Sequence, residues 1–157
     1  MSEFRLVIDT NIAVSALLLR GSVPRRAFDY AATQGRLLIS ESTIAELDQV
    51  LRRPKFDKYL TEADRLEFLA ALVRMAELIE IKETINICRD AKDNKFLELA
   101  VSGSATHLIS GDRDLLTLHP FRGIAIVTPQ QFLTPPLNEI ESKAVRDPAE
   151  NAKEEGR

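Results

Sequence analysis

Four acidic residues of this chain have the spacing to share one site: Asp9, Glu46, Asp93 and Asp112. Asp9 closes the apolar run of residues 4–8, and Asp112 comes shortly after the apolar run of residues 106–109. The carboxyl ends of parallel strands converge on one crevice, so we expect the four carboxylates to meet there. Crowded carboxylates repel one another unless a cation neutralises them. The sequence therefore predicts a divalent-metal site.

The elements that would position these acids follow from the apolar pattern. Five short runs are predicted strands: residues 4–8, 36–39, 78–81, 106–109 and 124–127. They are nearly continuously hydrophobic, which is typical of strands buried on both faces. Four stretches carry helical periodicity: residues 24–33, 42–52, 62–77 and 94–102. This alternation predicts a parallel sheet with right-handed crossovers. The two helices between the second and third strands could flank or cover the crevice.

Length and composition favour one domain over residues 1–137, followed by a charged, flexible extension over residues 138–157 that lacks aromatic side chains. The apolar stretches are too short to span a membrane, and the N-terminus has no signal-peptide layout. The single cysteine, Cys88, excludes an intramolecular disulfide. We therefore expect a cytoplasmic protein. The net charge of -3 does not exclude an anionic substrate, because the four proposed ligands are among the acids.

Each acid also has a purely structural explanation. Asp9, Asp93 and Asp112 stand where helices begin, and Asp is a favoured N-cap residue. Thr43 and Glu46 have the spacing of a capping box. Capping does not require carboxylates, however, because Ser, Thr and Asn serve as well. Four acids at four strand–helix junctions therefore favour the metal-site interpretation.

Several segments carry a resemblance when taken together in order. They are Asp9-Thr10-Asn11, Glu46, residues 89–100, residues 110–116 and the closing run of residues 128–133. This set resembles the PIN-domain nucleases over about residues 4–133, most closely the bacterial and archaeal branch assigned as toxins of toxin–antitoxin pairs. The resemblance implies a three-layer α/β/α fold with a central parallel five-stranded sheet. It also implies Mg²⁺ or Mn²⁺ as cofactor and cleavage of single-stranded RNA.

By position, the resemblance assigns Asp9, Glu46, Asp93 and Asp112 to the family's four acidic places. The three aspartates would hold Mg²⁺ directly or through its waters, and Glu46 would orient or deprotonate the attacking water or join a second ion. Whether one or two ions act stays open. The auxiliary candidates are Asn11, Ser110, Asp90 and Asp114. Asp90 and Asp114 could assist a second ion or cap a helix, and for Asp90 we favour the cap.

The candidate phosphate-binding cations are Arg25, Arg26, Lys95 and Arg113. Solvated helix ends are the alternative explanation for such residues, since Lys and Arg also favour the helix dipole. The protein partners implied by the resemblance are a cognate antitoxin and a second copy of the chain.

Two other functions stay open at the level of sequence. An aspartate-based phosphatase or phosphotransferase also places an Asp after its first strand, but it would want a second Asp where this chain has Asn11. A non-catalytic module that binds RNA or a protein partner would not need all four acids. A metal-dependent ribonuclease is therefore the preferred interpretation.

Overall fold

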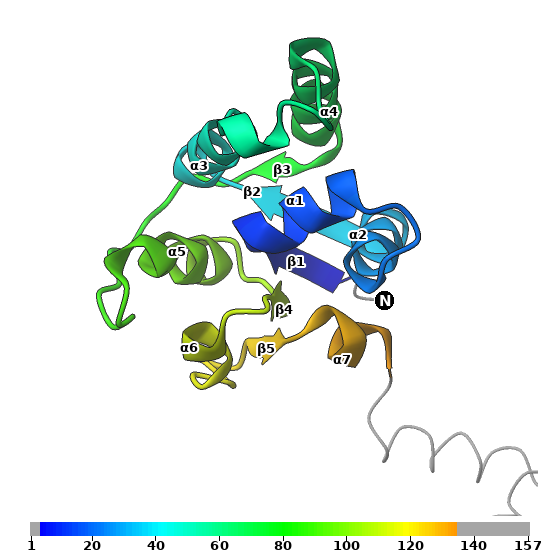
Figure 1. Ribbon diagram of the computed structural model, residues 1–157. Helices are drawn as coiled ribbons and strands as arrows, with labels where there is room; N and C mark the ends of the chain where they lie inside the picture. Colours follow the sequence, from blue (N-terminus) through cyan, green and yellow to red (C-terminus); the bar gives the residue numbers. More distant parts are fainter. Residues whose placement is uncertain (1–3, 135–157) are drawn as a thin grey trace, which may run out of the picture.

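The computed structural model describes residues 4–134, and these residues form an α/β/α sandwich around one five-stranded sheet (Figure 1). The strands are β1 (Phe4–Ile8), β2 (Gly35–Ile39), β3 (Glu77–Leu78), β4 (His107–Ile109) and β5 (Ala125–Val127). The helices are α1 (Thr10–Leu18), α2 (Val23–Gln34), α3 (Glu41–Leu51), α4 (Glu62–Met75), α5 (Asn94–Ser102), α6 (Arg113–Leu116) and α7 (Pro129–Leu133). Two 3₁₀ turns, η1 (Pro54–Phe56) and η2 (Ala91–Asp93), precede α4 and α5. The extension predicted over residues 138–157 lies outside the described residues.

The sheet has the strand order β3-β2-β1-β4-β5, and every pairing in it is parallel. Leu6 of the central strand β1 is in register with Leu37 of β2 on one side and His107 of β4 on the other. This order confirms the predicted parallel α/β fold. It also places the carboxyl ends of β1 and β4 side by side, which is where Asp9 and Ser110 leave the sheet.

The two faces of the sheet build two separate cores because successive side chains of a strand point to opposite sides. Leu6, Leu37 and Ile39 face a core shared with α1, α2, α3 and α4. Val7 and Leu108 face the other core, which includes residues of α5 and α6. Strands buried on both sides explain why their sequences are hydrophobic without alternation.

The third strand is shorter than its sequence predicts. We expected a strand over residues 78–81, but β3 covers only Glu77–Leu78. One more backbone hydrogen bond follows, from the Ile79 N–H to the Ile39 carbonyl. From there to η2 the chain forms no regular element. A β-rich sequence does not form a strand where no further strand edge pairs with it.

Helix α5 holds this irregular segment by its side chains. Ser102, Glu98 and Asn94, spaced four residues apart on one face of α5, accept backbone N–H groups of the segment. The donors are Lys82, Ile85, Ile87 and Cys88. These bonds replace the strand ladder and fix the approach of the chain to the turn that carries Asp93.

The described residues contain no helix that is long and apolar enough to cross a lipid bilayer.

Candidate functional site

Asp9 lies directly after β1, at the point where α1 begins. One carboxylate oxygen accepts the backbone N–H of Ile12 at 3.0 Å, so the residue does cap its helix. The other oxygen accepts a hydrogen bond from the hydroxyl of Ser110. The side chain is 5% exposed, and this burial raises the pKa of Asp9. The hydrogen bonds from Ser110 and Ile12 oppose the rise in pKa, whereas the charge of Asp112 adds to it.

Ser110 joins the two central acids of the site. Its side chain is fully buried at the end of β4, and its hydroxyl donates to Asp9 while accepting the backbone N–H of Asp112 at 2.9 Å. The carboxylate of Asp112 in turn accepts the backbone N–H of Asp114 at 2.9 Å and caps α6. The Ser110 hydroxyl thus links the Asp9 carboxylate to the backbone that carries Asp112.

Asp93 reaches this pair of acids from another part of the chain, the turn η2 that precedes α5. It stands at the start of α5 but makes no capping hydrogen bond, so capping does not account for it. Its pKa is raised to about 7, first by burial, then by hydrogen bonding to Asp112 and by the negative charges of Asp112, Asp90 and Asp9. Burial and nearby negative charge both disfavour the ionised form of Asp93, as expected for a carboxylate that shares a partly buried site with other carboxylates.

Glu46 lies on α3 and meets a cation instead of the other acids. Its carboxylate forms an ion pair with the ammonium group of Lys95 on α5. The capping box of α3 is made by Ser40 and Thr43, whose side chains each accept the other's backbone N–H. The capping-box alternative for Glu46 is therefore wrong, and its carboxylate pairs with Lys95 instead.

The donor chemistry of Asp9, Asp93 and Asp112 fits a hard divalent cation. They supply carboxylate oxygens, and the raised pKa values of Asp9 and Asp93 show that positive charge would stabilise their ionised forms. Within residues 4–134, no three His, Cys, Asp or Glu side chains are already arranged to hold an ion. A cation that keeps part of its hydration shell needs fewer direct ligands, which suits Mg²⁺.

The auxiliary residues divide between capping and the site. Asp90 caps η2 by accepting the Lys92 N–H at 3.0 Å, in agreement with the preferred interpretation. Asp114 lies 3.9 Å from a guanidinium nitrogen of Arg89. Asn11 is exposed in the first turn of α1. Both Asp90 and Asp114 contribute negative charge near Cys88.

The four candidate cations have different surroundings. Arg25 binds Asp29 at 3.2 Å and the Ala16 carbonyl at 3.2 Å, contacts that hold it against α1 and α2. Arg26 is exposed on α2, and Arg113 is exposed directly beside Asp112. Lys95 is paired with Glu46, so its charge is already matched within the protein. Position beside an acid favours Arg113 as the phosphate-binding candidate.

Two residues near the acids are not among the predicted site residues. Asn94 is 6% exposed, and its carbonyl oxygen accepts the N–H groups of Ile87 at 3.2 Å and Cys88 at 2.9 Å. The signal that could have revealed it is a polar amide inside the first turn of an otherwise apolar helix face. Burial raises the pKa of Cys88 to about 11, and the charges of Asp93 and Asp112 add to this rise.

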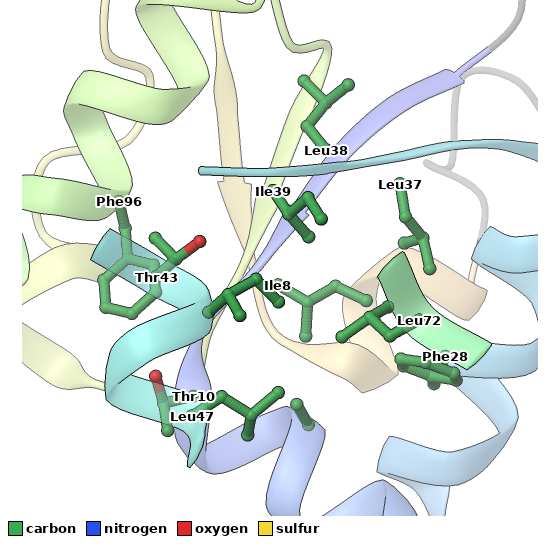
Figure 2. A pocket seen from close by; sticks show the side chains of 12 residues that line it. Ile8, Thr10, Phe28, Leu37, Leu38, Ile39, Thr43, Leu47, Leu72 and Phe96 are labelled. Carbon is green, nitrogen blue, oxygen red and sulfur yellow. The ribbon is translucent and has the colours of Figure 1, made fainter. Parts of the chain in front are cut away.

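A narrow cavity lies between the sheet and the helices α1 and α3 (Figure 2). Its volume is about 40 Å³, and its lining is apolar except for the hydroxyls of Thr10 and Thr43. Ile8, Leu47 and Phe96 are among the other residues that line it. A space of this size holds water but no nucleotide.

The protein is a parallel α/β/α sandwich. Acidic residues gather at the carboxyl edge of its central strands, and these two features define its structural class. The chain belongs to the PIN domain family, whose sequence profile matches residues 5–114. The uncharacterized protein MJ1680 of Methanocaldococcus jannaschii is 33% identical over 118 residues, which are 74% of this chain and 76% of that protein.

Two solved structures share the fold at lower identity. One is VapBC2 from Rickettsia felis bound to a DNA fragment from its promoter, with a TM-score of 0.56, 14% identity, and coverage of 78% of this chain and 97% of that chain. The other is PAE2754 from Pyrobaculum aerophilum, with a TM-score of 0.54, 17% identity, and coverage of 83% and 88%. These likenesses confirm the arrangement of the sheet and helices.

Proposed function

We propose that this protein is an endoribonuclease that hydrolyses phosphodiester bonds of single-stranded RNA with Mg²⁺ or Mn²⁺ as cofactor. The observation that carries the proposal is the grouping of Asp9, Asp93 and Asp112 at one edge of the sheet, where burial, hydrogen bonding to Asp112 and the neighbouring negative charges raise the pKa of Asp93 to about 7. Membership of the PIN domain family supports nuclease chemistry.

Asp9, Asp93 and Asp112 would hold the ion. The chemistry that Mg²⁺ or Mn²⁺ supplies when bound is neutralisation of the phosphodiester charge and acidification of water. Ser110 fixes the orientation of the Asp9 carboxylate through its hydrogen bond, so this ligand needs little reorganisation. Arg113 beside Asp112 is placed to attract the phosphate group of the substrate.

Glu46 is the general base of the proposed reaction. A carboxylate can accept a proton from the attacking water, provided that the side chain is held within hydrogen-bonding reach. The Glu46 side chain is 24% exposed, so solvent can reach it. In-line attack of water on phosphorus that breaks the bond to the 3′-oxygen would leave a 3′-hydroxyl and a 5′-phosphate.

The biological role that we propose is that of the toxin in a toxin–antitoxin pair acting on RNA in the cytoplasm. The fold shared with the VapBC2 structure supports this role, because that protein is seen bound to a DNA fragment from its promoter. An antitoxin segment laid across the acidic edge would block the site, and a homodimer is the expected assembly. Co-expression with the product of the adjacent reading frame tests this role: relief of growth arrest supports it.

The test of the enzymatic proposal is cleavage of a fluorescent single-stranded RNA by the purified protein. We expect cleavage with Mn²⁺ or Mg²⁺, none with EDTA, and none by Asp9→Asn. Small phosphate esters in the same assay separate the nuclease from a phosphatase. RNA binding without cleavage at any metal concentration would instead identify a non-catalytic module.

A further inference from the structure

Lys95 is unusually constrained for a lysine near a proposed nucleic-acid site. Its ammonium group forms an ion pair with Glu46 and donates to the Lys92 carbonyl at 2.9 Å. It also lies 5.7 Å from the centre of the Phe96 ring. The side chain is only 20% exposed. Three contacts hold a side chain that would otherwise have many rotamers, so its position is determined by the fold.

The ion pair joins two helices that carry different parts of the site. Lys95 is the second residue of α5 and comes two positions after Asp93. Glu46 belongs to α3, 49 positions before Lys95. The two side chains are 20% and 24% exposed, so solvent screens their attraction less than it screens that of a surface pair. The contact thereby fixes Glu46 relative to the helix that follows Asp93.

The same geometry argues against direct phosphate binding by Lys95. An ammonium group has three donors, and two of them are used by Glu46 and the Lys92 carbonyl. A phosphate that approached the remaining donor would also approach the Glu46 carboxylate, and like charges repel. The predicted role of Lys95 as a substrate-binding residue therefore does not fit its surroundings.

We propose that Lys95 is a positioning residue that holds the Glu46 carboxylate beside α5. The inference rests on the proposed function, because it explains how the general base of that reaction keeps its place. Without Lys95, Glu46 is a half-buried carboxylate on α3 that no other cation among residues 4–134 pairs with.

The pair itself is tested in the metal-free protein by urea unfolding of Lys95→Met, Glu46→Gln and the double variant. Each single change leaves the partner half-buried and unpaired, whereas the double change removes both groups. Each variant raises the equilibrium constant for unfolding by some factor relative to the wild type. We expect the factor for the double variant to be at least about threefold smaller than the product of the two single-variant factors. Independent effects would overturn the proposal, whether or not the protein cleaves RNA.

The role of the pair is tested by Mn²⁺-dependent RNA cleavage. A displaced general base lowers kcat, by roughly a hundredfold for a shift of about 1 Å, whereas KM changes little. We expect Lys95→Met to show this pattern, Lys95→Arg to recover much of the rate, and Glu46→Gln/Lys95→Met to be no slower than Glu46→Gln alone. Lys82→Met is the matched control, since Lys82 is exposed and pairs only with Glu80 among the described residues.

Other outcomes of the RNA cleavage assay would contradict either the positioning role of Lys95 or the proposed nuclease activity. A raised KM and a reduced salt dependence of RNA binding in Lys95→Met would identify a phosphate contact and overturn the positioning role. A wild-type protein that cleaves no RNA would refute the proposed nuclease, while the unfolding experiment would still decide whether the pair holds Glu46.

Discussion

The hydroxyl of Ser110 donates a hydrogen bond to the carboxylate of Asp9, a residue 101 positions away in the sequence. The two residues follow β4 and β1, which are paired in parallel at the centre of the sheet. Both side chains are almost completely buried. A buried carboxylate needs hydrogen bonds to remain ionised, and Ser110 supplies one while binding the Asp112 backbone with the same hydroxyl.

Replacing Asp9 with Asn is expected to remove metal-dependent RNA cleavage without unfolding the protein. Burial already disfavours the charged form of Asp9, and an amide can still accept the N–H of Ile12. The melting temperature should therefore stay the same or rise. Circular dichroism melts and the RNA assay, run on the same preparations, check both parts. An active Asp9→Asn variant would contradict the assignment of this site.

Replacing Ser110 with Ala is expected to weaken both the fold and the site. The change removes a donor to Asp9 and leaves the backbone N–H of Asp112 without its acceptor, which costs about 1–3 kcal/mol of stability where the group is buried. Loss of such an outer-shell partner also typically weakens metal affinity or activity by about 10–100-fold.

Urea unfolding and Mn²⁺ titration measure the two effects of Ser110→Ala. Ser102→Ala is the matched control, because its hydroxyl accepts a more exposed N–H, that of Lys82. Equal behaviour of the two variants would show that Ser110 has no special role.

The stability of the metal-free protein should fall as the pH rises from about 4 to about 7. The pKa of Asp93 is about 7 in the folded protein, against an ordinary value of 3.8. Between these values the folded state binds more protons than the unfolded state, so raising the pH favours unfolding. The destabilisation is complete above the folded pKa. The raised pKa of Asp9 acts in the same direction.

Melting temperatures measured in EDTA across this pH range check the prediction. Asp93→Asn should flatten the dependence, because it removes the group that titrates. A metal-free protein whose stability rises over the same interval would show that the acids do not crowd one another in solution.

Divalent ions should stabilise the wild-type protein, and most strongly at neutral pH. An ion that binds only the folded state raises its stability by about 2.7 kcal/mol at a hundredfold excess over the dissociation constant. At neutral pH the ion also relieves the repulsion that raises the pKa of Asp93. Thermal melts with increasing Mn²⁺ check this, with Ca²⁺ as a comparison.

Asp112→Asn should lose most of the stabilisation by Mn²⁺, because it removes a proposed ligand. Glu77→Gln is the control for the loss of one acidic charge, since Glu77 pairs with Arg5 at the start of β3. An identical Mn²⁺ response in both variants would place ion binding elsewhere.

Much of the fold could be predicted from the sequence because the strands are short, apolar and separated by helical periodicity. The parallel sheet and the helices α2, α3, α4 and α5 agree with the patterns to within a few residues. The third strand is the exception. Residues 79–81 carry a strand-like sequence, but side chains of α5 hold the segment that follows. Local propensity contains no information about such a partner.

The sequence by itself determined which acids stand at strand ends, because that depends only on their order relative to the apolar runs. It left each of them with two explanations. Only the tertiary structure decided that Asp9 both caps its helix and binds Ser110, that Asp93 caps nothing, and that Glu46 pairs with Lys95. These contacts depend on the strand order β2-β1-β4 and on the packing of α3 against α5. Residues so far apart in sequence meet only when non-local pairing brings their elements together, and the local patterns of a single sequence do not reveal that pairing.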